Sequence, residues 1–245
     1  MLTDIWAVMR KELQELLLQR TNVRGNLRGG WLILLVMLGI FGVFLPLRSG
    51  PAWLRSPVDL LLWAWVPLFL VSSVTADSFA GERERHTLET LLASRLSDRD
   101  IFFGKVAALV AYGWGLALLN ILIGLIAVNL AYAGGHLLLY PIDLASGGVA
   151  LSLLEAGLSA AGGTLISLRA STVRQAIQTT TIALMLLLFA LVLGLQALPA
   201  QVTQSLSGLS LGQFVLGVAV VLALVDALLL ALGMARFKRA KLILD

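Results

Sequence analysis

Residues 77–105 read DSFAGERERHTLETLLASRLSDRDIFFGK and form the long charged interruption in an otherwise apolar chain. Of the 245 residues, 59% are hydrophobic and 13% are charged, and the mean hydropathy is +0.93. A soluble domain carries about 25% charged residues. The composition therefore predicts an integral membrane protein in which residues 77–105 lie in water.

Apolar stretches on both sides of this segment are long enough to cross a bilayer, which takes roughly 20 residues for about 30 Å of hydrocarbon. Six such stretches occur, near residues 30–47, 59–76, 106–132, 145–168, 176–198 and 213–235. Only helices and closed barrels satisfy their backbone in lipid, and runs of this length are helical. We therefore expect an all-α membrane protein with six transmembrane helices.

The distribution of Lys and Arg predicts how the spans are oriented. Sixteen of the eighteen lie in the N-terminal segment, residues 77–105, the connection after the fourth span and the C-terminus, whereas Arg48 and Arg55 lie on the opposite side. Because loops rich in Lys and Arg stay inside the cell, both termini and the 77–105 loop are predicted to be cytoplasmic. The expected location is the inner (plasma) membrane, as a multi-pass protein. Since these bases flank spans and form no stripe on a soluble fold, a nucleic-acid partner is not expected.

The first 29 residues are predicted to form an amphipathic helix at the membrane interface. Apolar side chains recur there at three- and four-residue steps, at Leu2, Ile5, Trp6, Met9, Leu13, Leu16 and Leu17. A helix packed on another protein surface is the alternative. Residues 30–235 then form the six-span domain, and residues 236–245 a basic cytoplasmic tail.

The 77–105 segment has its own helical pattern. Thr87 is suited to cap a short helix in which Leu88, Leu91 and Leu92 share a side, and Ser97 is suited to cap the next helix. Gly81 is a candidate break after the second span. The Leu residues either dock a soluble partner or simply pack on neighbouring spans.

Several elements of this segment resemble the second-to-third loop of ABC type-2 transporter permeases, the membrane subunits of ATP-driven exporters. These elements are the triplets ERE at 82–84 and TLE at 87–89, the pair LL at 91–92 and the closing GK at 104–105. The chain departs from that pattern at His86, where Gly is typical, and at residues 95–96, where a Pro is typical. The resemblance implies a coupling helix that docks an ATPase subunit through Glu82, Glu84, Thr87, Leu88, Glu89, Leu91, Leu92 and Lys105.

The resemblance also implies the partners. Two copies of an ABC ATPase subunit would bind ATP and Mg, and a second permease copy or paralogue would complete a dimer in the membrane lipid. This chain itself is expected to bind no cofactor or metal and to have no ATPase site. A P-loop needs GxxxxGK[ST], and Gly104–Lys105 is followed by Val106 and lacks the upstream glycine.

Polar residues inside the spans form a second candidate site. Glu155 lies near the middle of the fourth span on one face with Ser152 and Ser159, Asp226 lies in the sixth span, and Asn120 lies in the third. Ionisable groups at such depth line substrate or proton paths, whereas small polar seams also serve as contacts between helices. Both interpretations stay open. An ATP-independent secondary transporter or channel that uses Glu155 and Asp226 is therefore the alternative function.

Overall fold

The computed structural model describes residues 2–21, 28–87, 95–197, 199, 201, 208 and 210–237. All the elements in this part of the chain are helices, and it contains no strand, so the predicted all-α class is confirmed. In chain order the helices are α1 (Leu2–Thr21), α2 (Arg28–Met37), the π-helix η1 (Leu38–Phe44), α3 (Leu45–Ser49), the 3-10 helix η2 (Gly50–Leu54), α4 (Pro57–Glu84), α6 (Asp98–Tyr132), α7 (Ile142–Ser167), α8 (Val173–Gln196) and α10 (Leu211–Arg236).

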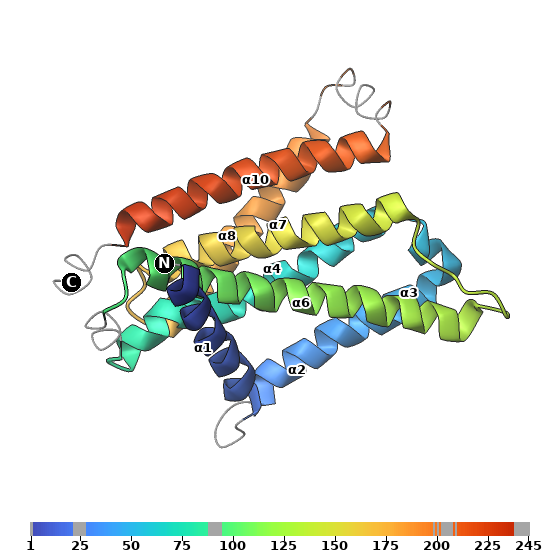
Figure 1. Cartoon of the computed structure of the whole chain (residues 1–245). Helices are drawn as coiled ribbons and strands as arrows, with labels where there is room; N and C mark the ends of the chain where they lie inside the picture. The colour runs from blue at the N-terminus through green and yellow to red at the C-terminus, as the bar shows by residue number, and fades with distance from the viewer. Residues whose placement is uncertain are drawn as a thin grey trace.

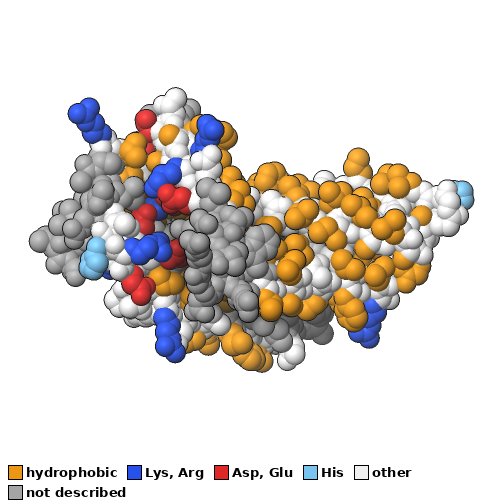
Figure 2. Space-filling view, turned by 90° about the horizontal axis from the view of Figure 1, so that it is seen from below, with side chains coloured by type: hydrophobic (Ala, Val, Ile, Leu, Met, Phe, Trp, Pro, Cys, Tyr) orange, Lys and Arg blue, Asp and Glu red, His pale blue; other side chains and the backbone are white. Residues whose placement is uncertain are grey.

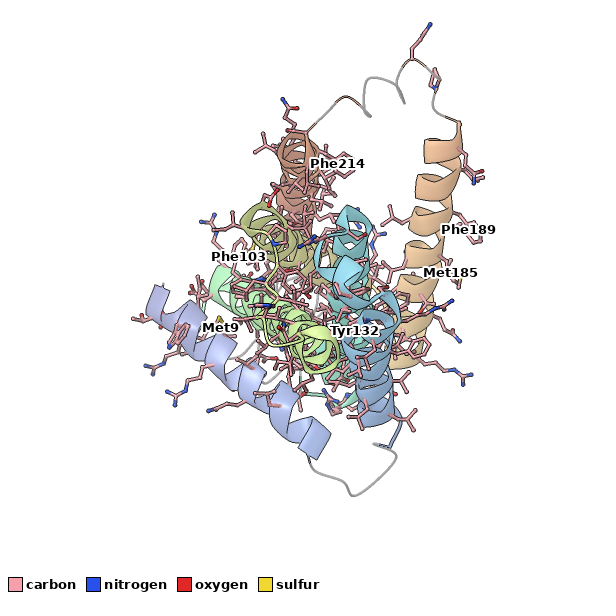
Figure 3. The ribbon with its side chains drawn as sticks, turned by 90° about the vertical axis from the view of Figure 1, so that its right-hand side faces the viewer. Met9, Phe103, Tyr132, Met185, Phe189 and Phe214 are labelled. Carbon is pink, nitrogen blue, oxygen red and sulfur yellow. The ribbon has the colours of Figure 1, made fainter. Side chains whose placement is uncertain are left out.

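The long helices α4, α6, α7 and α10 run side by side as one bundle, and α8 crosses it obliquely (Figures 1 and 3). At its centre α4, α6 and α7 pack on one another. On the outside, α10 packs on α7, α8 packs on α4 and α7, and η1, α3 and η2 lie against α6. The remaining helix, α1, crosses α6 obliquely at one end of the bundle (Figures 1 and 3).

Among the described residues, four helical segments are long and apolar enough to cross a membrane, namely Leu34–Leu54, Asp98–Tyr132, Ile142–Ser167 and Leu211–Arg236. The other two predicted spans, 59–76 and 176–198, overlap α4 and α8, which have 28 and 24 residues, and their crossing of the membrane stays a prediction. At 1.5 Å per residue, even α8 is about 36 Å long. Hydrophobic side chains cover most of the length of the molecule, whereas charged side chains gather at one end (Figure 2). This surface is that of a membrane protein.

The first apolar stretch is helical but irregular. In a regular α-helix the ring of Pro46 would collide with the carbonyl of Gly42, and Pro46 has no N–H to donate. The backbone ahead of Pro46 is accordingly loosened into η1, where the N–H of Leu45 bonds to the carbonyl of Ile40, five residues back. The chain then tightens into α3 and η2.

Helix α1 packs on α6 through a face that includes Val8 and Glu12, both of which are buried. The approach is close, because a Cβ on Gly104 of α6 would lie 2.6 Å from the Cβ of Val8. Two of the residues predicted for the apolar face, Trp6 and Leu17, remain 61% and 53% exposed. Helix α1 therefore has an inner face that packs on α6 and an outer face that still carries large apolar side chains.

The described parts of the 77–105 segment, residues 77–87 and 95–105, are more buried than the sequence suggested. Gly81 is not a break, because α4 continues to Glu84, and α6 already begins at Asp98. Phe79, Phe102 and Lys105 are fully buried in the bundle, so the prediction that the whole stretch lies in water is wrong. The ring of Phe237, which follows α10, lies 5.4 Å from the ring of Phe79 and 5.9 Å from that of Phe102. This aromatic cluster joins α4, α6 and the end of α10.

Candidate functional site: the polar end of the bundle

The polar end is the end at which α4 finishes and α6 and α8 begin. It is centred on three consecutive residues, Glu82, Arg83 and Glu84, in the last turn of α4. Successive residues of a helix point in directions about 100° apart, so the three side chains reach different neighbours.

Glu82 joins α4 to α6 and, through Lys105, to α1. The Lys105 Nζ lies 2.8 Å from Glu82 Oε1 and 2.9 Å from Glu12 Oε1, and the Lys105 side chain is 1% exposed. The ammonium also lies 5.4 Å from the centre of the Phe79 ring, within cation–π distance. Burial raises the pKa of Glu82 above its ordinary value, and the charge of Lys105 opposes that rise.

Arg83 joins α4 to the end of α7. Its guanidinium donates to the carbonyl of Leu168, at 3.1 Å, and to the carbonyl of Ala170. The last carbonyls of a helix have no partner within the helix and carry the negative end of its dipole. A cation that donates to carbonyls at this point both satisfies them and offsets that charge.

Glu84 joins α4 to the start of α8. Its Oε2 accepts a hydrogen bond of 3.1 Å from the backbone N–H of Val173, the first residue of α8. The first N–H groups of a helix lack internal acceptors, and a carboxylate is favourable there. The Oγ of Ser167 adds a further α4–α7 contact, because it donates to the carbonyl of Ala76 and accepts from the N–H of Ala80.

The end of α4 has the geometry of a Schellman motif. The N–H of Thr87 bonds to the carbonyl of Glu82 at 2.9 Å, and the N–H of His86 bonds to the carbonyl of Arg83 at 3.1 Å. This motif needs a left-handed residue, and His86 adopts φ of 57°. Glycine is the residue usually found in that conformation, so the departure of His86 from the permease pattern falls where the backbone favours glycine.

The predicted coupling helix itself lies outside the described residues, with Leu88, Glu89, Leu91 and Leu92. On the near side of it, the Thr87 hydroxyl donates back to the carbonyl of Glu82 at 3.3 Å. On the far side, the prediction that Ser97 caps the next helix is confirmed. Its Oγ accepts from the N–H of Asp100 at 3.2 Å.

Lys105, one of the residues predicted to dock a partner, is not on the surface. Its ammonium is buried between Glu12 and Glu82, so it holds helices together and offers no surface to a partner. The sequence pattern did not indicate that Glu12, Arg83 and Ser167 belong to the site. A signal was available only for Glu12, which is a charged residue on the face of α1 that packs on α6.

The polar residues inside the spans do not gather in one site, because they contact different neighbouring helices. Ser159 donates to the carbonyl of Leu68 on α4, at 3.1 Å, and Ser152 donates to its own helix at Val149. A Cβ on Gly42 of η1 would lie 2.7 Å from Asn120 Oδ1, and one on Gly157 of α7 would lie 2.6 Å from Asp226 Oδ2. For Ser159 in particular, the contact is the kind that the helix-seam interpretation predicts.

Within the described ranges, no group of three or more His, Cys, Asp or Glu side chains is arranged to hold a metal ion. Comparison with models of known protein families gave no match, and comparison with curated proteins gave none either.

Proposed function

We propose that this chain is the permease subunit of an ATP-binding-cassette exporter, which moves a substrate across the membrane when a separate ATPase subunit hydrolyses ATP. In this proposal all six apolar segments span the inner membrane, and both termini and the polar end face the cytoplasm. Two ATPase subunits, with their ATP and Mg, dock beneath a dimer of permease chains.

The arrangement around Glu82, Arg83 and Glu84 is the observation that carries the proposal. These residues immediately precede the connection between α4 and α6, and they contact α6, α7 and α8, with α1 reached through Lys105. A force applied to that connection by a soluble subunit would therefore reach α1, α6, α7 and α8. An ATP-driven rearrangement of the bundle requires residues that transmit movement of the connection to several helices at once, as these contacts would do.

The docking part of the proposal is tested by co-purification with a co-expressed ATPase subunit. The double variant Leu91→Asp/Leu92→Asp should lose the ATPase subunit. The variant Leu137→Asp is the control, because Leu137 lies exposed in the connection between α6 and α7 and not at the polar end. Retained ATPase binding and ATP-driven transport in the double variant would overturn the assignment.

The orientation is tested with cysteines, because the natural chain contains none. Single substitutions Ser97→Cys and Ser171→Cys place a thiol on exposed residues of the polar end, and His136→Cys places one in the connection between α6 and α7. A membrane-impermeant maleimide added outside intact cells should label only the cysteine at 136. Labelling of the cysteines at 97 and 171 instead would reverse the proposed topology.

An ATP-independent secondary transporter or channel is the second candidate. It is favoured by the buried Glu155 Oε2 and Asp226 Oδ1, which have no hydrogen-bond partner among the described residues. Unpaired carboxyl groups at this depth are costly and suit a proton or cation path. Transport that persists without any ATPase subunit and is abolished by Glu155→Gln or Asp226→Asn would establish this alternative.

A further inference from the structure

A groove opens between the end of α7 and the first two turns of α8. Its volume is about 230 Å³. One side is apolar, one end is cationic, and the remainder carries an amide and a hydroxyl. The lining residues are Leu165, Ile166, Arg169, Ala170, Gln175 and Thr179.

The groove lies at the boundary between the polar and apolar parts of the surface. In the first two turns of α8 the exposed side chains are mostly polar, namely Arg174, Gln175, Gln178 and Thr179, with Ile177 as the apolar exception. From the third turn on, they include Ile182 and Met185. Helix α8 stands at the edge of the bundle, with Met185 and Phe189 farther along it (Figure 3). Lipid headgroups contact a membrane protein at such a change from polar to apolar surface.

The charges around the groove favour an anion. The Arg169 guanidinium is exposed and makes no ion pair with any carboxylate in the described ranges, and no carboxylate lines the groove. On α4, Arg83 donates to carbonyls at the end of α7 and Glu84 accepts from the N–H of Val173, and neither side chain lines the groove. A planar guanidinium matches two oxygens of a phosphate group.

The polar lining supplies further donors beside Arg169. The Gln175 side-chain carbonyl accepts from the N–H and hydroxyl of Ser171. The NH₂ group of Gln175 takes no part in these two bonds. Thr179 adds a hydroxyl one turn deeper, and Leu165 and Ile166 give an apolar wall. From the surface inward, the groove thus offers a cation, then hydrogen-bond donors, then hydrocarbon.

We propose that this groove binds the headgroup of an anionic phospholipid. Arg169 contacts the phosphate, the NH₂ of Gln175 and the hydroxyl of Thr179 donate to the phosphate and glycerol oxygens, and the start of an acyl chain lies on Leu165 and Ile166. Basic pockets between helices at this membrane depth suit such headgroups. The site rests on the membrane placement of α8 proposed above, but it does not require ATP-driven transport, so the two proposals can fail separately.

The test is native mass spectrometry of the purified full-length chain in detergent, supplied with phosphatidylglycerol or phosphatidylcholine. We expect about fivefold higher retention of phosphatidylglycerol, which corresponds to about 1 kcal/mol for one Arg near an anionic headgroup. Arg169→Gln should reduce the preference to near one. Arg174→Gln is the matched control, since Arg174 is exposed in the first turn of α8 but does not line the groove.

A second variant separates the groove from general surface charge. Thr179→Phe fills the groove and leaves Arg169 in place, so it should also abolish the preference. Equal retention of the two lipids by the natural chain would overturn the proposal, as would an equal loss in Arg174→Gln. Inorganic phosphate at millimolar concentration should not displace the lipid. Displacement by phosphate would show a site for free anions and would refute the lipid assignment.

Discussion

Replacing Lys105 by methionine removes the ammonium that Glu12 and Glu82 share and keeps a side chain of similar length. The two carboxylate side chains are only 11% and 13% exposed, so neither can recover a full hydration shell in the folded protein. Removal of one member of a buried ion pair costs about 3–5 kcal/mol, because the remaining charge is left unpaired. At about 2–4 °C per kcal/mol for a chain of this size, the thermal midpoint should fall by on the order of 10 °C.

A triple variant distinguishes unpaired charge from loss of packing. Glu12→Leu/Glu82→Leu/Lys105→Met carries no charge at the three positions, and replacing a complete buried ion pair by hydrophobic residues of similar volume is often close to neutral. It should therefore recover most of the stability that Lys105→Met loses. Lys11→Met is the surface control. Lys11 is 58% exposed and lies 3.3 Å from Glu15 in an i,i+4 pair and 4.0 Å from Glu12 Oε1, and exposed ion pairs of this kind contribute only about 0–1 kcal/mol each.

The effect of Lys105→Met also depends on pH. Without the ammonium, burial raises the pKa of the Glu82 carboxyl in the folded state still further above its unfolded value. A group whose pKa is raised by folding destabilises the protein as pH increases from its unfolded value through its folded value. The difference in midpoint between variant and natural chain should therefore shrink as pH falls from 7.5 towards 5.

Fluorescence-detected size-exclusion chromatography after heating, in one detergent throughout, measures these midpoints. A Lys105→Met midpoint within the range of the Lys11→Met control would refute the buried-triad reasoning. Equal destabilisation in the single and triple variants would assign the loss to packing and would equally contradict it.

Three other predictions concern the end of α4 and its packing on α6 and α7. His86→Gly should stabilise the chain by about 0.5–1 kcal/mol in the same thermal assay, since glycine adopts the left-handed conformation without the Cβ penalty; a lower midpoint would contradict it. Oxidation of Val71→Cys/Gly113→Cys should give an intramolecular disulfide, visible as a gel shift, because the Cβ atoms would be 3.5 Å apart. The pair Val71→Cys/Gly115→Cys should not cross-link, since a Cβ on Gly115 meets nothing within 4 Å. Arg83→Ala should cost about 2–3 kcal/mol, because two carbonyls at the end of α7 lose a charged donor, and an unchanged midpoint would exclude that role.

Local sequence was sufficient for features that depend on near neighbours in the chain. The helical class follows from the length of the apolar runs, and the cap at Ser97 follows from a hydroxyl residue placed just before the first turn of α6. The apolar run around residues 30–47 was correctly identified as helical. Its π-helical form was not predicted, although the cause, Pro46 four residues after Gly42, is local.

Long-range contacts decided the rest. Whether Lys105 faces a partner protein or the interior depends on Glu12, which is 93 residues away in the sequence. Likewise, Arg83 and Glu84 hydrogen-bond to Ala170 and Val173 only because the connection between α7 and α8 packs against α4. The energetic cost of a charge is set by what surrounds it in space, and a linear pattern does not contain that information. Composition and local pattern therefore predict apolar helices with a charged end, whereas the packing of distant helices sets which of those charges hold the helices together.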